Sequence, residues 1–134
     1  MVESKRILVT GGNGFIGSNF IIDILSKNSL VLNIDAGYEG AVVPELRIWE
    51  KHKNYSLIED DINKLNLKSI LKNFKPELIF HFAAESHVDK SIIKPIDCYN
   101  SNLMSTLRLL EALRESNLST TFYFVSTDEV FGST

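Results

Sequence analysis

The chain has 134 residues and carries 14 basic and 17 acidic side chains, which gives a formal net charge of −3 at pH 7. This length fits one domain with a buried core, and the acidic balance argues against a polyanion-binding surface, so we expect no nucleic acid partner. A single cysteine, Cys98, excludes an internal disulfide, and the N-terminal apolar run is broken by glycines, so we expect a cytoplasmic protein without a membrane partner.

Short runs rich in β-branched residues alternate with helical patterns along the chain, which is typical of a parallel sheet with crossover helices. The apolar runs predict strands over 6–10, 30–35, 55–58, 78–82 and 121–125. Apolar periodicity predicts helices over 16–25, 62–73 and 96–116, whereas the structure of 36–53 stays open. We therefore expect an α/β fold of the Rossmann type, a doubly wound parallel sheet that is truncated after about its fifth strand.

The last of these helices, 96–116, carries a stripe of large apolar residues at helical spacing. Its members are Tyr99, Leu103, Leu107, Leu110 and Leu113. We expect this stripe to face the sheet and to lie in the core. Cys98, on the same helix, is expected to take part in its packing.

Four polar or glycine-rich segments follow predicted strands, namely 10–17, Asp35, 81–87 and 126–132. In an open α/β sheet, ligands bind in the crevice beyond the carboxyl ends of the strands. All four segments lie at such ends, so they predict one binding site along one edge of the sheet.

The first of these segments has the sequence TGGNGFIG and lies between a strand and a helix. We expect Gly11 to permit the tight turn, Gly14 to let the backbone approach a pyrophosphate, and Gly17 to let the helix pack close to the sheet. A phosphate loop of the NTPase type is excluded because no Gly-Lys-Ser/Thr follows the glycines. The alternative is a flexible turn that binds no ligand.

Asp35 ends the second predicted strand, where a carboxylate can accept hydrogen bonds from both hydroxyls of an adenosine ribose. A 2′-phosphate would be repelled there, so the sequence predicts NAD rather than NADP as the cofactor. The alternative for Asp35 is a capping role.

The acidic run after the third strand predicts a helix cap at Asp60 and an adenine contact by Asp61 and Ile62.

Two histidines, His81 and His87, bracket the segment after the fourth strand. The sequence shows no obvious third ligand near them, so we expect no metal site and instead histidines whose hydrogen bonds are satisfied at the end of the strand. Between them, Ala83 and Ala84 are small enough for the backbone to lie against a flat cofactor.

The glycine spacing of TGGNGFIG resembles that of the extended short-chain dehydrogenase/reductase family. The segments HFAAESHVDKSI (81–92) and STDEVFG (126–132) are similar to those of the dTDP-glucose 4,6-dehydratases within this family. The resemblance covers essentially the whole chain. It implies an NAD-dependent lyase of nucleotide-sugar metabolism, active in dTDP-rhamnose biosynthesis, that converts dTDP-glucose to dTDP-4-keto-6-deoxyglucose through transient hydride transfer to bound NAD.

The resemblance also implies roles for the side chains of STDEVFG, because elimination needs a base and an acid on neighbouring sugar carbons. Glu129 matches the base that removes the C5 proton, and Asp128 matches the acid that assists loss of the C6 hydroxyl. Thr127 matches the hydroxyl that orients the C4 oxygen of the substrate. We expect the two carboxylates to titrate as a coupled pair in a partly dry site, and the alternative is a solvated turn.

Matching to the family residue by residue implies further contacts. Phe15 and Ile16 would flank the pyrophosphate, and Ser86 would reach the substrate. The full set of expected cofactor contacts is Gly11, Gly14, Phe15, Ile16, Gly17, Asp35, Asp61, Ile62, Ala83, Ala84 and Ser101. Ser101 stands where the family has a threonine and keeps the hydroxyl, whereas Phe131 replaces the family's usual tyrosine.

One part of the family's machinery is not found in the sequence. Family members carry a Tyr-x-x-x-Lys pair on a later helix, which takes the C4 hydroxyl proton and holds the nicotinamide ribose, and no such pair follows Gly132. We therefore expect residues 1–134 to form an incomplete NAD-binding Rossmann domain, without a C-terminal substrate domain and without dehydratase activity of its own. The resemblance implies a sugar-nucleotide substrate and, as is usual in the family, a homodimer. The alternatives are another NAD-dependent sugar-nucleotide epimerase or dehydratase, and a non-catalytic NAD-binding fragment.

Overall fold

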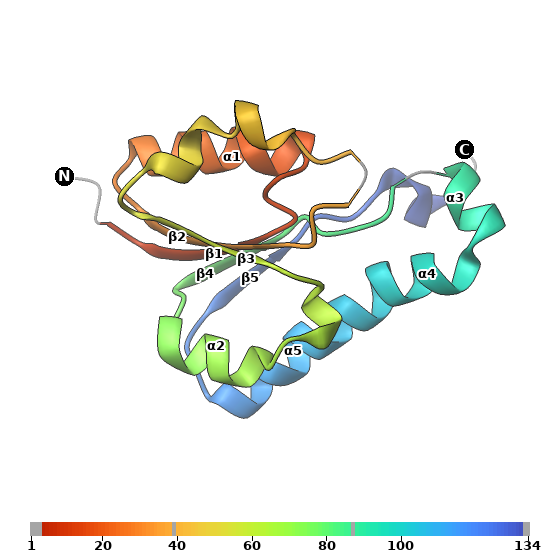
Figure 1. Cartoon of the computed structure of the whole chain (residues 1–134). Helices are drawn as coiled ribbons and strands as arrows, with labels where there is room; N and C mark the ends of the chain where they lie inside the picture. Colours follow the sequence, from red (N-terminus) through yellow and green to blue (C-terminus); the bar gives the residue numbers. More distant parts are fainter. Residues whose placement is uncertain (1–3, 39, 87, 133–134) are drawn as a thin grey trace.

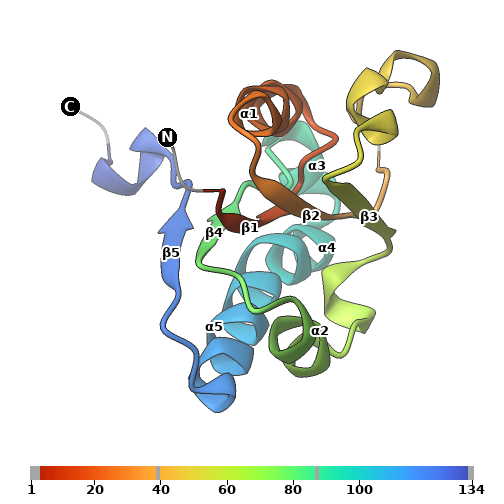
Figure 2. The same ribbon diagram turned by 90° about the vertical axis from the view of Figure 1, so that its left-hand side faces the viewer.

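The computed structural model describes residues 4–38, 40–86 and 88–132. Within them the strands form one parallel sheet in the order β3-β2-β1-β4-β5, as Figure 1 and Figure 2 show. The strands are β1 (Arg6–Thr10), β2 (Leu30–Asp35), β3 (Tyr55–Glu59), β4 (Leu78–His81) and β5 (Thr121–Phe124). The strand order reverses direction at β1, which confirms the expected Rossmann-type α/β fold.

Helices cover both faces of the sheet (Figure 1). Helix α1 (Phe15–Ser26) lies on one face, and α2 (Leu67–Phe74) and α5 (Ser105–Ser116) lie together on the other. Helices α3 (Val88–Ile93) and α4 (Pro95–Tyr99) lie beyond the carboxyl ends of the strands (Figure 1). The candidate edge of the sheet therefore lies between α1 on one side and α3 and α4 on the other.

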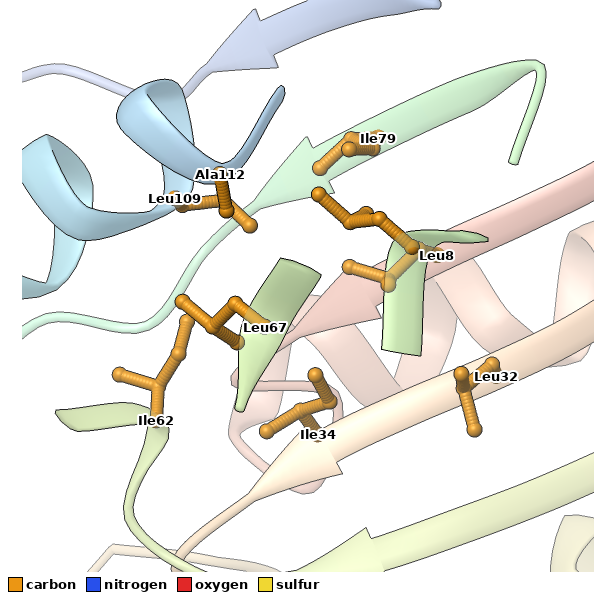
Figure 3. Packing of buried hydrophobic residues seen from close by; sticks show 9 residues of the cluster. Leu8, Leu32, Ile34, Ile62, Leu67, Ile79, Leu109 and Ala112 are labelled. Carbon is orange, nitrogen blue, oxygen red and sulfur yellow. The ribbon is translucent and has the colours of Figure 1, made fainter. Parts of the chain in front are cut away.

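Two apolar cores hold the sheet between its helices, because successive strand residues point to opposite faces. The core beneath α2 and α5 consists of Leu8, Leu32, Ile34, Ile62, Leu67, Leu71, Ile79, Leu109 and Ala112 (Figure 3). The core beneath α1 consists of Ile7, Val9, Ile21, Ile24, Leu25, Val31, Trp49 and Tyr55. The ends of β1, β2 and β4 are thus fixed by the two cores, whereas Tyr123, Phe124 and Val125 at the end of β5 are exposed.

The helix expected over 62–73 begins later than predicted. A 3-10 turn, Ile62–Lys64, comes first, and α2 follows it. Asn66 caps α2, because its side-chain Oδ1 accepts a hydrogen bond from the backbone N–H of Ser69 at 3.1 Å. A capping asparagine satisfies an N–H group at a helix start, so the chain begins a new helix there.

The helical segment expected over 96–116 consists of α4, a π-helical turn (Asn100–Met104) and α5. The prediction that its large apolar stripe lies in the core was wrong. Tyr99, Leu103, Leu107 and Leu110 are 54%, 50%, 54% and 43% exposed, and of the five residues Leu113 alone packs against the core. The buried face of α5 holds Ser105, Leu109 and Ala112 instead. Two of these side chains are small, and they let the helix lie close to the sheet.

The segment between β2 and β3 forms two 3-10 turns, Pro44–Leu46 and Ile48–Lys51. Trp49 inserts its side chain into the core beneath α1, and Arg47 is buried, with its Nε donating to the carbonyl of Val42 at 2.6 Å. The segment therefore packs on the domain as part of it. Among the described residues, no helix is long and apolar enough to cross a membrane.

Candidate functional site

The turn between β1 and α1 has the geometry of a dinucleotide-binding turn. Gly11 has a φ of +71°, and a Cβ built there would lie 2.6 Å from the backbone nitrogen of Ala83. A Cβ on Gly17 would overlap the carbonyl oxygen of Gly11, whereas a Cβ on Gly14 would meet only that oxygen, at 3.4 Å. Gly11 and Gly17 are therefore required by packing, and the space beside Gly14 is open.

The start of α1 is also open to an anion. Gly14 is its N-cap residue, no side chain caps the helix, and its first turn contains no acidic residue. Phe15 and Ile16, which begin the helix, are 81% and 62% exposed. The free N–H groups and the positive end of the helix dipole thus face solvent, which is the arrangement that binds a phosphate group.

Asp35 lies beside this turn, at the end of β2, and its carboxylate is oriented by two backbone groups. One oxygen accepts a hydrogen bond from the N–H of Asn13 at 2.8 Å, and the other accepts one from the N–H of Gly37 at 2.8 Å. A carboxylate oxygen can accept more than one hydrogen bond, so both oxygens keep capacity for a ribose hydroxyl. These residues fit an adenosine diphosphate group without a 2′-phosphate.

Asn33 supports the turn from below, a role that was not predicted from the sequence. Its Oδ1 accepts from the N–H of Gly12 at 3.0 Å, and its Nδ2 donates to Asn13 Oδ1 and to the hydroxyl of Tyr55, both at 3.0 Å. Asn33 is fully buried. The available signal was an amide side chain inside the otherwise apolar run LVLNI, since a buried polar group must find partners.

The acidic residues after β3 differ in part from expectation. The capping role given to Asp60 was wrong, because Asp61 is the cap, with its Oδ1 accepting from the N–H of Asn63 at 2.9 Å. Asp60 instead accepts from the N–H of Asp61 at 2.7 Å. The other oxygen of Asp61 accepts from the hydroxyl of Tyr38 at 3.4 Å, and burial followed by this carboxylate raises the pKa of Tyr38. Ile62 is buried in the core, so its backbone is what remains for a ligand.

His81 is a satisfied core histidine, as expected. It is 1% exposed, and its two ring nitrogens lie 2.5 Å from the hydroxyl of Thr10 and 2.9 Å from the hydroxyl of Thr106. Burial lowers the pKa of His81 to about 4. His87 lies outside the described residues.

The segment after β4 is held against the glycine turn and against the π-helical turn Asn100–Met104. The N–H of Phe82 donates to the carbonyl of Thr10 at 3.0 Å. The side chain of Asn102 accepts from the N–H of Glu85 at 2.6 Å and donates to its carbonyl at 3.0 Å. Asn102 was also missed, because one amide on a helix gives no sequence signal of a partner across the fold.

The small residues expected to line a cofactor lie at this position. Ala83 is half-buried against Gly11, and Ala84 is exposed. Ser86 is exposed, and Ser101 is half-buried in the π-helical turn, where its carbonyl accepts from the hydroxyl of Ser105.

The segment STDEVFG follows β5, and a 3-10 turn (Asp128–Phe131) forms within it. The N–H of Val125 donates to the carbonyl of His81 at 3.3 Å, which places this segment beside the end of β4. Thr127 donates to Asp128 Oδ1 at 3.4 Å, and both residues are exposed. The side chain of Glu129 lies outside the described part. The water-excluded setting expected for the carboxylate pair is therefore not formed at Asp128 by the described residues.

The chain is similar in sequence to a known family. Residues 8–134 match the family described as GDP-mannose 4,6 dehydratase. A probable dTDP-glucose 4,6-dehydratase of Sinorhizobium fredii is 39% identical, over 96% of this chain and 39% of the relative. The chain thus spans about two fifths of the length of the curated relatives it matches.

Solved structures show the same fold with related sequences. The dTDP-glucose 4,6-dehydratase of Bacillus anthracis, solved in complex with NAD, superposes with a TM-score of 0.79 at 34% identity and covers 96% of this chain and 39% of that one. A UDP-N-acetylglucosamine 4-epimerase of Methanobrevibacter ruminantium, in complex with UDP-N-acetylmuramic acid, superposes with a TM-score of 0.85 at 32% identity and covers 98% and 41%. By its sequence match over 8–134 and its sheet topology, the chain belongs to the GDP-mannose 4,6 dehydratase family.

Proposed function

We propose that the chain is the NAD-binding part of a dTDP-glucose 4,6-dehydratase, which converts dTDP-glucose to dTDP-4-keto-6-deoxyglucose. The observation that carries the NAD site is the uncapped start of α1 beside Gly14, with Asp35 oriented next to it. The likeness to the Sinorhizobium and Bacillus dehydratases supports the reaction. The single cysteine favours a cytoplasmic location.

Each half of the cofactor site has its own supporting residues. The N–H groups at the start of α1, beside Phe15 and Ile16, would bind the pyrophosphate, and Asp35 would accept from the adenosine ribose. Asp61 and the backbone of Ile62 would lie at the adenine. Ala83, Ala84 and Ser101 would line the nicotinamide half.

The side chains after β5 would perform the elimination. Bound NAD would supply a hydride acceptor for C4 of the sugar and would return the hydride to C6. Thr127 would hold the C4 oxygen, Glu129 would take the C5 proton, and Asp128 would give a proton to the C6 hydroxyl, which leaves as water. The hydrogen bond from Thr127 to Asp128 brings these two side chains together, which supports roles at C4 and C6 of the same sugar.

Residues 1–134 would not complete this reaction alone. These 134 residues contain no Tyr-x-x-x-Lys pair, so they do not supply this pair to take the proton of the C4 hydroxyl. Without oxidation at C4, the C5 proton is not acidic enough for Glu129 to remove. Incubation with NAD and dTDP-glucose should therefore give no 4-keto-6-deoxy product by mass spectrometry.

The experiment that tests the cofactor is calorimetric titration with NAD and with NADP. Wild type should bind NAD and discriminate against NADP, because the 2′-phosphate would meet the Asp35 carboxylate. Asp35→Asn should lose about tenfold in NAD affinity, since it weakens hydrogen bonds to an ionised acceptor. Asp23→Asn, which removes an exposed carboxylate of α1 paired with Lys27, should keep both affinities. A folded wild type that binds neither cofactor would contradict the proposal.

Self-association through the exposed stripe of α4 and α5 is part of the proposed function. The exposed large apolar residues that a second copy would cover, at helical spacing, are Tyr99, Leu103, Leu107 and Leu110. Sedimentation should show a dimer in wild type and a monomer in Leu107→Ser. Ile48→Ser, at a more exposed apolar site in the 3-10 turn Ile48–Lys51, should remain dimeric. A wild-type chain that stays monomeric at every concentration would contradict the proposed self-association.

A second candidate function is a UDP-sugar 4-epimerase, which the likeness to the Methanobrevibacter enzyme favours. A 4-epimerase has no need for the paired carboxylates Asp128 and Glu129. Saturation-transfer NMR on the NAD-loaded chain separates the two functions. We expect transfer to the sugar protons of dTDP-glucose that Thr127→Val weakens, and transfer to UDP-N-acetylglucosamine alone would favour the epimerase.

A further inference from the structure

A chain of hydrogen bonds crosses the sheet directly beneath the candidate site. It runs from Thr10, the last residue of β1, to His81, the last residue of β4, and on to Thr106 of α5. Thr106 in turn donates to the carbonyl of Asn102 at 2.7 Å. The function proposed above assigns no role to Thr10, His81 or Thr106.

The hydrogen bond from Thr106 to the carbonyl of Asn102 determines which atoms donate and which accept in the other two bonds. Because the Thr106 hydroxyl gives its proton to the carbonyl of Asn102, its oxygen accepts from His81 Nε2–H. The Nδ1 of His81 then carries no proton and accepts from the hydroxyl of Thr10. The ring is therefore neutral, with its proton on Nε2, and both nitrogens are satisfied.

Among the residues that the structure describes, burial alone lowers the pKa of His81, and no charged group contributes to the shift. The aromatic neighbours of His81 are Phe122 and Phe124 of β5, with ring centroids 6.0 Å and 5.9 Å away. The other described contacts are the two hydroxyls. A proton on Nδ1 would leave the Thr10 hydroxyl without its acceptor, and a second ring proton would bury a charge among apolar groups.

The same chain controls the spacing of the segments that would contact the cofactor. Thr10 directly precedes Gly11, and its hydroxyl oxygen accepts from the N–H of Ala83 at 3.4 Å. The backbone of Ala83 lies so close to Gly11 that no side chain fits between them. Asn102, which accepts from Thr106 through its carbonyl, also holds Glu85 through its side chain.

We propose that His81 is a positioning residue which, as the neutral Nε2–H tautomer, fixes the glycine turn, the segment 82–85 and the π-helical turn of Ser101 at the spacing that the dinucleotide requires. This rests on the proposed NAD site. His81 does not touch the cofactor; it acts through Thr10 and Thr106. A change in the ring would move Ala83 against Gly11 and would alter both walls of the site.

Two matched variants test this inference by NAD titration. Thr106→Val keeps the shape of the side chain but leaves His81 Nε2–H unsatisfied, and we expect NAD affinity to fall about tenfold. Thr106→Ser restores the hydroxyl and should recover affinity close to that of wild type. Thr120→Val removes a hydroxyl that donates to Pro76 at 2.7 Å, at the opposite edge of the sheet, and should leave the affinity unchanged.

Circular dichroism on each variant shows whether a loss of NAD affinity comes from unfolding or from a displaced site. A fully folded Thr106→Val with wild-type affinity would overturn the inference. An independent readout uses wild type alone. In ¹⁵N-histidine NMR at pH 7, the resonance that disappears in His81→Gln should show an unprotonated Nδ1 and a protonated Nε2, and the opposite tautomer or a cationic ring would overturn the inference. If wild type itself fails to bind NAD, the proposed function fails, and the NMR result still tests the tautomer.

Discussion

Acidification should destabilise the fold through protonation of His81, in the pH range between its pKa in the folded chain and its pKa in the unfolded chain. Burial lowers the pKa of this imidazole from 6.5 to about 4. Between these values the unfolded chain binds a proton that the folded chain does not, so the free energy of unfolding falls as the pH falls. The full stability is present above pH 6.5, and the loss is complete below the folded-state pKa.

The magnitude follows from the size of the shift. The free energy of unfolding should be about 2 kcal/mol lower at pH 5 than at pH 7.5, and the loss should reach about 3 kcal/mol near pH 4. The value at pH 5 changes little with the folded-state pKa, provided that this pKa stays well below 5. The imidazole has no carboxylate partner among the described contacts, so nothing offsets the cost of the buried charge.

The assay is urea unfolding followed by circular dichroism from pH 5 to pH 7.5. Carboxylates also begin to titrate in this range, so the quantity to compare is the difference between wild type and His81→Gln, which cannot take up a proton there. We expect the pH-dependent loss to shrink by about 2 kcal/mol in this variant. Equal pH dependence in wild type and His81→Gln would refute the reasoning.

Two further predictions concern the glycine turn and its support. Gly17→Ala should lower the free energy of unfolding by about 2 kcal/mol or more, because its Cβ would overlap the Gly11 carbonyl oxygen. Gly14→Ala should lower it by under about 1 kcal/mol and yet weaken NAD binding at least tenfold; urea unfolding and NAD titration measure the two effects. Equal stability losses in the two variants would count against the assignment of these glycines. Asn33→Leu should destabilise by about 2–4 kcal/mol, since it leaves Gly12 N–H, Asn13 and Tyr55 without their partner, and Asn19→Leu on exposed α1 should change stability by under about 0.5 kcal/mol. A tolerated Asn33→Leu would mean that the turn does not depend on this amide.

Local sequence patterns predicted the elements whose cause is local. The strands are short β-branched runs, and the turn between β1 and α1 needs glycine at Gly11 and Gly17 for reasons of packing that recur wherever a strand enters a helix in this way. The convergence of the polar segments also followed, because the carboxyl ends of parallel strands share one edge.

The errors have a different origin, because they depend on how elements pack. The helix of α4 and α5 has two apolar faces, and periodicity detected the one with the larger side chains, whereas the sheet took the face with Leu109 and Ala112. Asp60 and Asp61 are equivalent in sequence, and the backbone direction after β3 decided which of them caps. Which helix face packs on the sheet and which aspartate caps the turn depend on tertiary geometry, which cannot be read from one sequence.

The residues that were missed are polar groups whose partners are distant in the chain. Asn33, Asn102 and Thr106 bond to groups in other elements, and no local motif announces such a pair. Only Asn33 gave a signal, as a polar residue inside an apolar strand.

The measurement that tests the central claim most directly is a titration of the ¹⁵N-labelled chain with NAD, followed through the backbone amides. The largest shifts should fall on Gly14, Phe15 and Ile16 at the start of α1 and on Gly37 beside Asp35, because these N–H groups would meet the pyrophosphate or share the ribose-binding carboxylate. Shifts confined to the opposite edge of the sheet, or no shifts in a folded sample, would contradict the assignment of a dinucleotide site to this turn.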